Sequence, residues 1–138
     1  MTPERRKIKV LLAQFSLETH SRGIITVAGM LRDSGMEVVY IGNNTPEQIM
    51  EAAVHEDVDV VGISSYCGGE LALGADLMEA ANKRGAKDRM IFLLGGIFPP
   101  ANAPKLKEIG FDGTFAPGAT REEISSFIDK AVAAKARV

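Results

Sequence analysis

The 138-residue sequence has few of the side chains from which disulfides, metal clusters and nucleic-acid interfaces are built. It contains one cysteine, two histidines and no tryptophan. A single cysteine excludes an internal disulfide and favours a reducing, cytoplasmic location. One cysteine and two histidines also make a poor set from which to draw the three or four protein ligands of a zinc site.

The sequence also lacks a net positive charge, a long basic run and a long apolar run. The net charge is −2 and no basic run is longer than residues 5–7, so we expect no nucleic-acid partner. No stretch approaches the roughly 18 consecutive apolar residues of a membrane span, and no signal peptide precedes the first apolar run, so we expect no membrane association. With 46% hydrophobic residues, the composition indicates a single globular domain over residues 1–138, in which we expect 1–6 to be flexible.

Five short apolar runs, typical of buried strands, alternate with amphipathic or capped segments typical of helices. We predict strands at 8–15, 37–42, 58–65, 90–96 and 113–115. The helices that follow them are expected at 23–35, 45–56, 70–85, 103–110 and from Thr120 onward. This strict alternation predicts an α/β fold with a doubly wound, five-stranded parallel sheet and helices on both faces. At this length we expect the flavodoxin-like strand order 2-1-3-4-5.

Small and polar residues follow four of the predicted strands. His20 follows the first strand, 64–66 and 68–69 the third, 95–96 the fourth and 116–120 the fifth. Sheets of this kind bind ligands outside the carboxyl ends of their strands, so we predict the site at this edge. The many small residues suggest close approach of a large flat or long ligand, although ordinary turn chemistry explains each glycine taken alone.

His20, within LETHSRG (17–23), admits several interpretations. A general base requires reacting groups that this edge hardly offers, and a zinc ligand requires further ligands. A single axial ligand to a metal already held in a macrocycle requires only the imidazole and an acceptor for its Nδ1–H, which Glu18 can supply. A solvent-exposed loop histidine without a role is the remaining alternative, and this stretch by itself does not decide among them.

Three motifs at this edge stand in a distinctive order and spacing: E-T-H-S-R-G (18–23), S-S-Y (64–66) and G-G-I-F-P-P (95–100). They resemble the D-x-H-x-x-G, S-x-L and G-G elements of the cobalamin-binding domain of adenosylcobalamin-dependent mutases. The resemblance covers nearly the whole chain and is greatest to the methylmalonyl-CoA mutase branch. It includes the two prolines after the double glycine and the P-G pair before the last helix.

The resemblance implies adenosylcobalamin as the cofactor, bound base-off with His20 as the lower ligand of cobalt. It places Gly23 and the double glycine beside the released nucleotide tail, and Ser64 at the buried dimethylbenzimidazole. It implies no catalytic side chain, and His20 as the metal ligand. The cofactor-binding residues that it implies are Glu18, Thr19, His20, Ser21, Arg22, Gly23, Ser64, Ser65, Tyr66, Gly95, Gly96, Ile97, Phe98, Pro117, Gly118 and Thr120.

Three positions depart from the family pattern. Glu18 stands at the usual aspartate, Tyr66 at the usual leucine, and Ala119 at the usual threonine, with Thr120 one position further on. None of these changes removes the cobalt ligand. We therefore expect them to bear on the chemistry supported by the cofactor more than on cobalamin binding.

The resemblance further implies a subunit of an acyl-CoA carbon-skeleton mutase. The TIM barrel that binds acyl-CoA in such enzymes needs roughly 250 residues, so we expect it in a separate large subunit. The chain is then a small subunit, inactive alone, in a hetero-oligomer, with Tyr66, Phe98 and Pro99 expected on an exposed apolar rim that the partner covers.

Two alternatives remain. A corrinoid carrier protein of a methyltransferase system uses the same domain, but typically has a helical bundle ahead of it, for which residues 1–7 leave no room. The other is a non-catalytic module, either a cobalamin carrier or a phosphate-responsive receiver. A receiver needs an aspartate after the third strand, where Ser64 and Ser65 stand.

Overall fold

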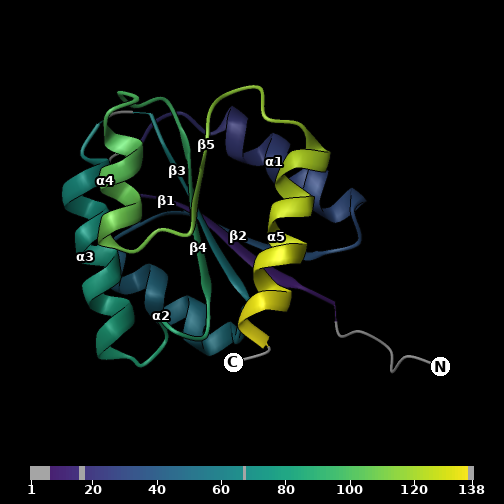
Figure 1. Cartoon of the computed structure of the whole chain (residues 1–138), viewed down its shortest axis with the longest axis horizontal. Coiled ribbons are helices and arrows are strands. Elements are labelled where there is room, and N and C mark those ends of the chain that lie inside the picture. Colours follow the sequence, from purple (N-terminus) through teal and green to yellow (C-terminus); the bar gives the residue numbers. More distant parts are fainter. Residues whose placement is uncertain (1–6, 16–17, 67, 137–138) are drawn as a thin grey trace.

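The computed structural model describes residues 7–15, 18–66 and 68–136, in which five parallel strands form one sheet between two layers of helices (Figure 1). The strands are β1 (Lys9–Phe15), β2 (Glu37–Asn44), β3 (Val60–Ser65), β4 (Ile91–Gly96) and β5 (Gly113–Phe115). The helices are α1 (Arg22–Asp33), α2 (Pro46–Glu56), α3 (Glu70–Lys83), α4 (Asn102–Ile109) and α5 (Arg121–Ala136). The strand order is β2-β1-β3-β4-β5, which confirms the predicted fold class. The expectation for residues 1–6 lies outside the described residues.

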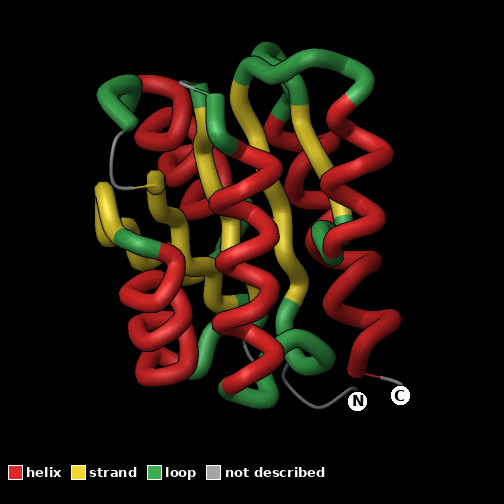
Figure 2. The backbone as a smooth tube through the Cα atoms, turned by 90° about the vertical axis from the view of Figure 1, so that its left-hand side faces the viewer, coloured by secondary structure: helices red, strands yellow, loops and turns green. Residues whose placement is uncertain are grey.

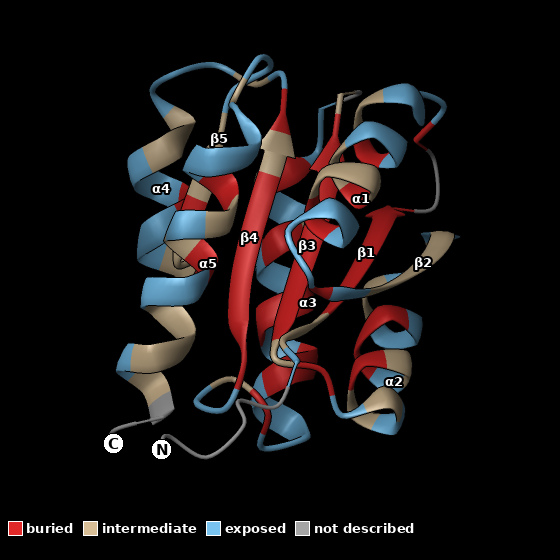
Figure 3. Ribbon diagram, turned by 90° about the vertical axis from the view of Figure 1, so that its right-hand side faces the viewer, coloured by how far each residue is buried: buried red, intermediate tan, exposed pale blue. Residues whose placement is uncertain are grey.

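The sheet divides the apolar core into two clusters. One lies under α1 and α5, where Ile24 and Ile128 pack with Leu12 of β1. The other lies under α2, α3 and α4, where Met50 and Leu77 belong to the same cluster. Figure 2 shows the parallel strands between the helices, and Figure 3 shows that the central strands are buried along their length. Burial on both faces explains why these strands are unbroken apolar runs in the sequence.

Two helix starts confirm their predicted caps. Thr45 and Gln48 form a capping box at α2. At α5, the backbone N–H of Thr120 donates to Glu123 Oε1, and the backbone N–H of Glu123 donates to Thr120 Oγ1. The bond from the Thr120 backbone lowers the pKa of the Glu123 carboxyl. α5 therefore begins at a defined residue beside the carboxyl edge of the sheet.

β2 is two residues longer than predicted and contains an irregularity. Leu12 is in register with Tyr40, but the next residue, Ala13, is in register with Gly42. Ile41 is thus an extra residue on β2, as in a β-bulge. The strand continues to Asn44 and brings Asn43 beside the end of β1.

None of the helices within the described ranges combines the length and the apolar character that crossing a membrane requires.

Candidate functional site

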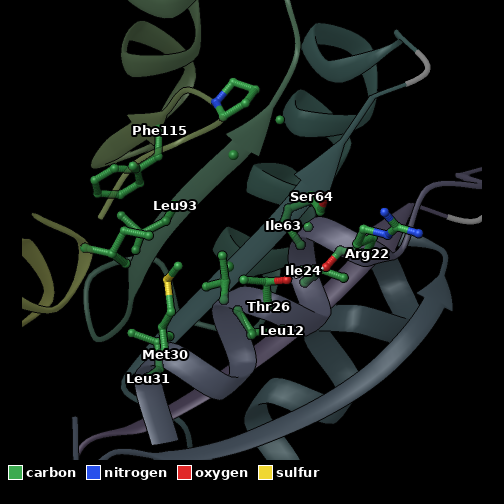
Figure 4. Close-up of a pocket in the computed structure, with 18 of the residues that line it drawn as sticks. Leu12, Arg22, Ile24, Thr26, Met30, Leu31, Ile63, Ser64, Leu93 and Phe115 are labelled. Carbon is green, nitrogen blue, oxygen red and sulfur yellow. Dashed lines mark hydrogen bonds between the residues drawn. The ribbon is translucent and has the colours of Figure 1, made fainter. Parts of the chain in front are cut away.

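An apolar cavity of about 750 Å³ lies between the sheet, α1 and α5, and its lining extends from Gly96 at the carboxyl edge of the sheet to Val10 and Val60 near the starts of β1 and β3. Met30 and Leu31 of α1 line it opposite Leu12 of β1 and Leu93 of β4 (Figure 4). Its volume is in the range of small-molecule and cofactor sites. Because most of the deep lining is hydrocarbon, the cavity suits a bulky apolar group.

His20 lies at this cavity, in the loop between β1 and α1, and its side chain is 61% exposed. Beneath it is Glu18, whose side chain is only 3% exposed. Glu18 Oε2 lies 3.0 Å from His20 Nδ1 and also accepts a hydrogen bond from the His20 backbone N–H at 3.2 Å. A carboxylate at Nδ1 favours the tautomer with the proton on that nitrogen, so the lone pair for a metal is on Nε2.

Glu18 also connects this loop to the end of β3. Its Oε1 accepts a hydrogen bond from the Tyr66 backbone N–H at 2.6 Å. The Tyr66 ring stacks on the imidazole of His20, with centroids 5.7 Å apart and ring planes at 30°. A Cβ atom at Gly23 would lie 2.8 Å from the Tyr66 hydroxyl oxygen. The structure therefore brings together the first two sequence motifs through direct contacts.

The two glycines that follow each other at the end of β4 have different roles. Gly96 has a φ of 132°, and a Cβ there would lie 2.0 Å from the Ser65 carbonyl oxygen, so the approach of β3 to β4 already requires glycine. At Gly95 a Cβ would meet only the Phe115 carbonyl oxygen, at 3.6 Å. Gly95 lines the cavity, so its missing side chain leaves room for a ligand rather than for the protein.

Most of the predicted site residues line the cavity. These are Thr19, His20, Ser21, Arg22, Gly23, Ser64, Tyr66, Gly95, Gly96, Pro117 and Gly118.

Five predicted residues lie elsewhere. Glu18 is buried and hydrogen-bonded to His20, while Ser65 is buried and accepts a hydrogen bond from the Ile97 backbone N–H. Thr120 caps α5. Phe98 is half-buried against the cluster under α2, α3 and α4, so its expected place on an exposed rim is wrong; Ile97, at 60% exposure, is the exposed apolar residue there. The aromatic ring of Phe98 packs against this core cluster and is not available at an exposed rim.

Sequence reasoning missed the residues that hold the His20 loop from below. Gln14 is fully buried, its Nε2 donates to the His20 carbonyl oxygen, and its Oε1 accepts from the Tyr40 hydroxyl at 2.7 Å. Asn43 Nδ2 donates to the carbonyl oxygens of Glu18 and Phe15. The sequence signal that could have identified Gln14 is an amide side chain within the otherwise apolar strand β1.

The metal-binding side chains available at this site fit a ligand that already contains its metal. Among the described residues, no group of three or more His, Cys, Asp or Glu side chains could hold a metal ion. A metal bound in a macrocycle needs one axial protein ligand, which the exposed imidazole of His20, hydrogen-bonded to Glu18 at Nδ1, could supply. The apolar cavity beside it, widened at Gly95, can take a flat heterocyclic appendage of such a ligand.

Comparison with known proteins gives matches along nearly the whole chain. A family model described as B12 binding domain matches residues 8–125. The chain is 35% identical over 133 residues to the 2-hydroxyisobutanoyl-CoA mutase small subunit of Aquincola tertiaricarbonis, covering 96% of this chain and 97% of that one. It is 40% identical over 120 residues to the pivalyl-CoA mutase small subunit of Xanthobacter autotrophicus, covering 86% and 80%. A longer protein, the methylmalonyl-CoA mutase large subunit of Streptomyces virginiae, is 33% identical over 133 residues, which are 95% of this chain but 18% of that one.

Solved structures match at lower identity. A cobalamin-binding protein from Desulfitobacterium hafniense superposes with a TM-score of 0.77 at 18% identity, over 91% of this chain and 59% of that one. The signal receiver domain of the putative response regulator NarL from Mycobacterium tuberculosis superposes with a TM-score of 0.71 at 20% identity, over 94% and 98%. These likenesses show the fold alone, since one fold serves several functions.

Proposed function

The chain belongs to the B12 binding domain family, and on this premise we propose that it is the cobalamin-binding small subunit of an adenosylcobalamin-dependent acyl-CoA carbon-skeleton mutase. The observation that carries the proposal is the position of His20, held by buried Glu18 at an apolar cavity of cofactor size. The two relatives that this chain matches over most of their length are both named as mutase small subunits.

In this proposal the cofactor binds base-off. His20 Nε2 is the lower ligand of cobalt, and Glu18 fixes the tautomer and the ring orientation. The cavity between α1, α5 and the sheet excludes water from the nucleotide tail, with Ser64 and Gly95 among its lining residues. When bound, adenosylcobalamin supplies radical chemistry through its cobalt–carbon bond, while the protein binds and orients it.

The substrate site belongs to another chain in this proposal. This chain corresponds to 18% of the methylmalonyl-CoA mutase large subunit that it matches, which leaves most of that protein without a counterpart here. We infer a separate large subunit, built around a TIM barrel that binds acyl-CoA, and a cytoplasmic hetero-oligomer of the two. The partner would then cover the part of the cofactor that this chain leaves exposed and would exclude water from it.

Titration of the purified chain with adenosylcobalamin tests the cofactor assignment. We expect a base-off absorption spectrum with the wild-type chain. His20→Ala is expected to lower the affinity by more than about 10-fold, the smallest loss usual when a group that orients a metal ligand is removed. His55→Ala, which removes an exposed histidine in the last turn of α2, is the matched control and should bind as wild type does. Equal affinities for the three proteins would contradict the assignment.

Replacement of Glu18 tests the role of the buried carboxylate. In Glu18→Gln one oxygen becomes an amide N–H₂ donor, so either the Tyr66 N–H or the His20 Nδ1–H loses its acceptor. We expect cobalamin affinity or partner-dependent activity to fall by about 10- to 100-fold. Glu51→Gln, at an exposed position on α2, controls for the loss of one negative charge. If Glu18→Gln matches that control, Glu18 does not orient the ligand.

A further inference from the structure

The loop that carries His20 is held by three side chains that lie outside the sequence motifs. Gln14, at the end of β1, donates through Nε2 to the His20 carbonyl oxygen. The Tyr40 hydroxyl on β2 donates to Gln14 Oε1 at 2.7 Å. Asn43, also on β2, donates to the Glu18 carbonyl oxygen. The backbone carbonyls of both the carboxylate residue and the imidazole residue are thus bound from the edge of the sheet.

The irregularity in β2 makes this arrangement possible. On a regular strand, residues three apart such as Tyr40 and Asn43 point to opposite faces of the sheet. The extra residue at Ile41 puts Tyr40 in register with Leu12 and Asn43 in register with Gln14. Leu12 and Gln14 are two residues apart on β1 and share a face, so Tyr40 and Asn43 stand on that same face, the one that α1 covers.

The hydrogen bonds of Gln14, Tyr40 and Asn43 restrain the His20 loop where side-chain packing does not. The His20 side chain is 61% exposed, so few neighbours restrict it from above. Gln14 is fully buried, and both the nitrogen and the oxygen of its amide are hydrogen-bonded; such a network is rigid because breaking it leaves buried polar atoms unpaired. Fixing the two carbonyls fixes the peptide planes from which the Glu18 and His20 side chains extend.

We propose that Gln14, Tyr40 and Asn43 are positioning residues that aim His20 at the cobalt. The proposal deepens the proposed function and rests on it. The second strand, through Tyr40 and Asn43, then contributes to ligation although neither residue lines the cavity. The arrangement predicts that loss of these hydrogen bonds changes which nitrogen binds cobalt, and does so without removing the ligand itself.

The test is electron paramagnetic resonance of Co(II) cobalamin bound to variants of the full chain, because nitrogen coordination splits the cobalt signal. Tyr40→Phe keeps the ring and removes only the bond to Gln14, and Asn43→Ala removes the bonds to Glu18 and Phe15. Each is expected to lower cobalamin affinity by about 10-fold and to reduce the fraction of cobalt bound by histidine nitrogen. Asn82→Ala, at an exposed position in the last turn of α3, is the matched control and should keep the wild-type signal.

A double variant tests whether the contacts act as one unit. Gln14→Leu removes both the donor and the acceptor of the amide with little change in volume, so adding Tyr40→Phe to it should cause no further loss of the histidine signal. Wild-type signals in Tyr40→Phe and Asn43→Ala overturn the inference, as does a loss of affinity with an unchanged fraction of histidine-bound cobalt, which indicates a merely structural role. If the wild-type chain itself shows dimethylbenzimidazole nitrogen on cobalt, the proposed function fails and the inference fails with it.

Discussion

The isolated chain is expected to show no isomerase turnover with adenosylcobalamin and any acyl-CoA, and addition of its cognate large subunit is expected to restore turnover. In the proposed function, the cavity of about 750 Å³ is filled by the nucleotide tail and is not open to a substrate. A second hollow, between α2 and α3, has about 260 Å³, and its charged lining residues are Glu47, Asp76, Glu79 and Lys83. It is smaller than usual ligand sites, and three carboxylates against one ammonium group disfavour the phosphates of coenzyme A.

Turnover is measured with the small subunit alone, the large subunit alone and the mixture, each with adenosylcobalamin. We expect product only in the mixture, and none when His20→Ala replaces the wild-type small subunit. Robust turnover by the isolated chain would contradict the division of labour between two subunits. Methyl transfer with a methyltransferase partner, in place of isomerisation, would support the corrinoid carrier of the alternative interpretation.

Filling the cavity at Gly95 is expected to abolish cobalamin binding while the fold is kept. A Cβ at this position has only the Phe115 carbonyl oxygen within 4 Å, at 3.6 Å, and Gly95 has no positive φ, so the backbone accepts a side chain. In Gly95→Leu the added atoms extend into the space that we assign to the nucleotide tail. We expect affinity to fall by about 100-fold or more, because a tail of fixed shape cannot share a filled site.

Equilibrium binding and thermal unfolding of the same samples separate a blocked site from a damaged fold. Gly29→Ala is the matched control, since Gly29 lies within α1 with no atom near the added Cβ. It should bind cobalamin normally and raise the stability by up to about 1 kcal/mol, as removal of a helical glycine does. Wild-type affinity in Gly95→Leu would place the nucleotide tail outside this cavity.

The architecture could be predicted because its determinants are local. Unbroken apolar runs define strands buried on both faces, and Thr45 and Thr120 define helix starts through bonds three residues away. Strict alternation of strands and helices is then compatible with few topologies. Motif order and spacing located His20, Ser64 and Gly95 at one edge for the same reason, since His20 lies in the loop after β1 and the other two are the second-last residues of β3 and β4.

The interior of the site could not be predicted, because the pattern of apolar residues does not say what they pack against. Ile24 and Leu31 recur at helical spacing, which is typical of a helix face packed on a core, and the structure places them in the cavity wall as well. Apolar periodicity indicates only that a helix face is shielded from water, and either a ligand or the rest of the protein can provide that shielding. The extra residue at Ile41 and the contact of Gly96 with Ser65 depend on neighbouring strands, so neither is encoded in a local pattern.

The measurement that tests the central claim most directly is electron paramagnetic resonance of Co(II) cobalamin bound to chain labelled with nitrogen-15 histidine. Because nitrogen-15 has a different nuclear spin from nitrogen-14, a bound histidine changes the splitting of the cobalt lines. The chain has two histidines, so labelled His55→Ala assigns the signal to His20. We predict that the splitting changes on labelling, persists in His55→Ala and disappears in His20→Ala. Splitting that labelling leaves unchanged, as from dimethylbenzimidazole nitrogen, would contradict ligation of cobalt by His20.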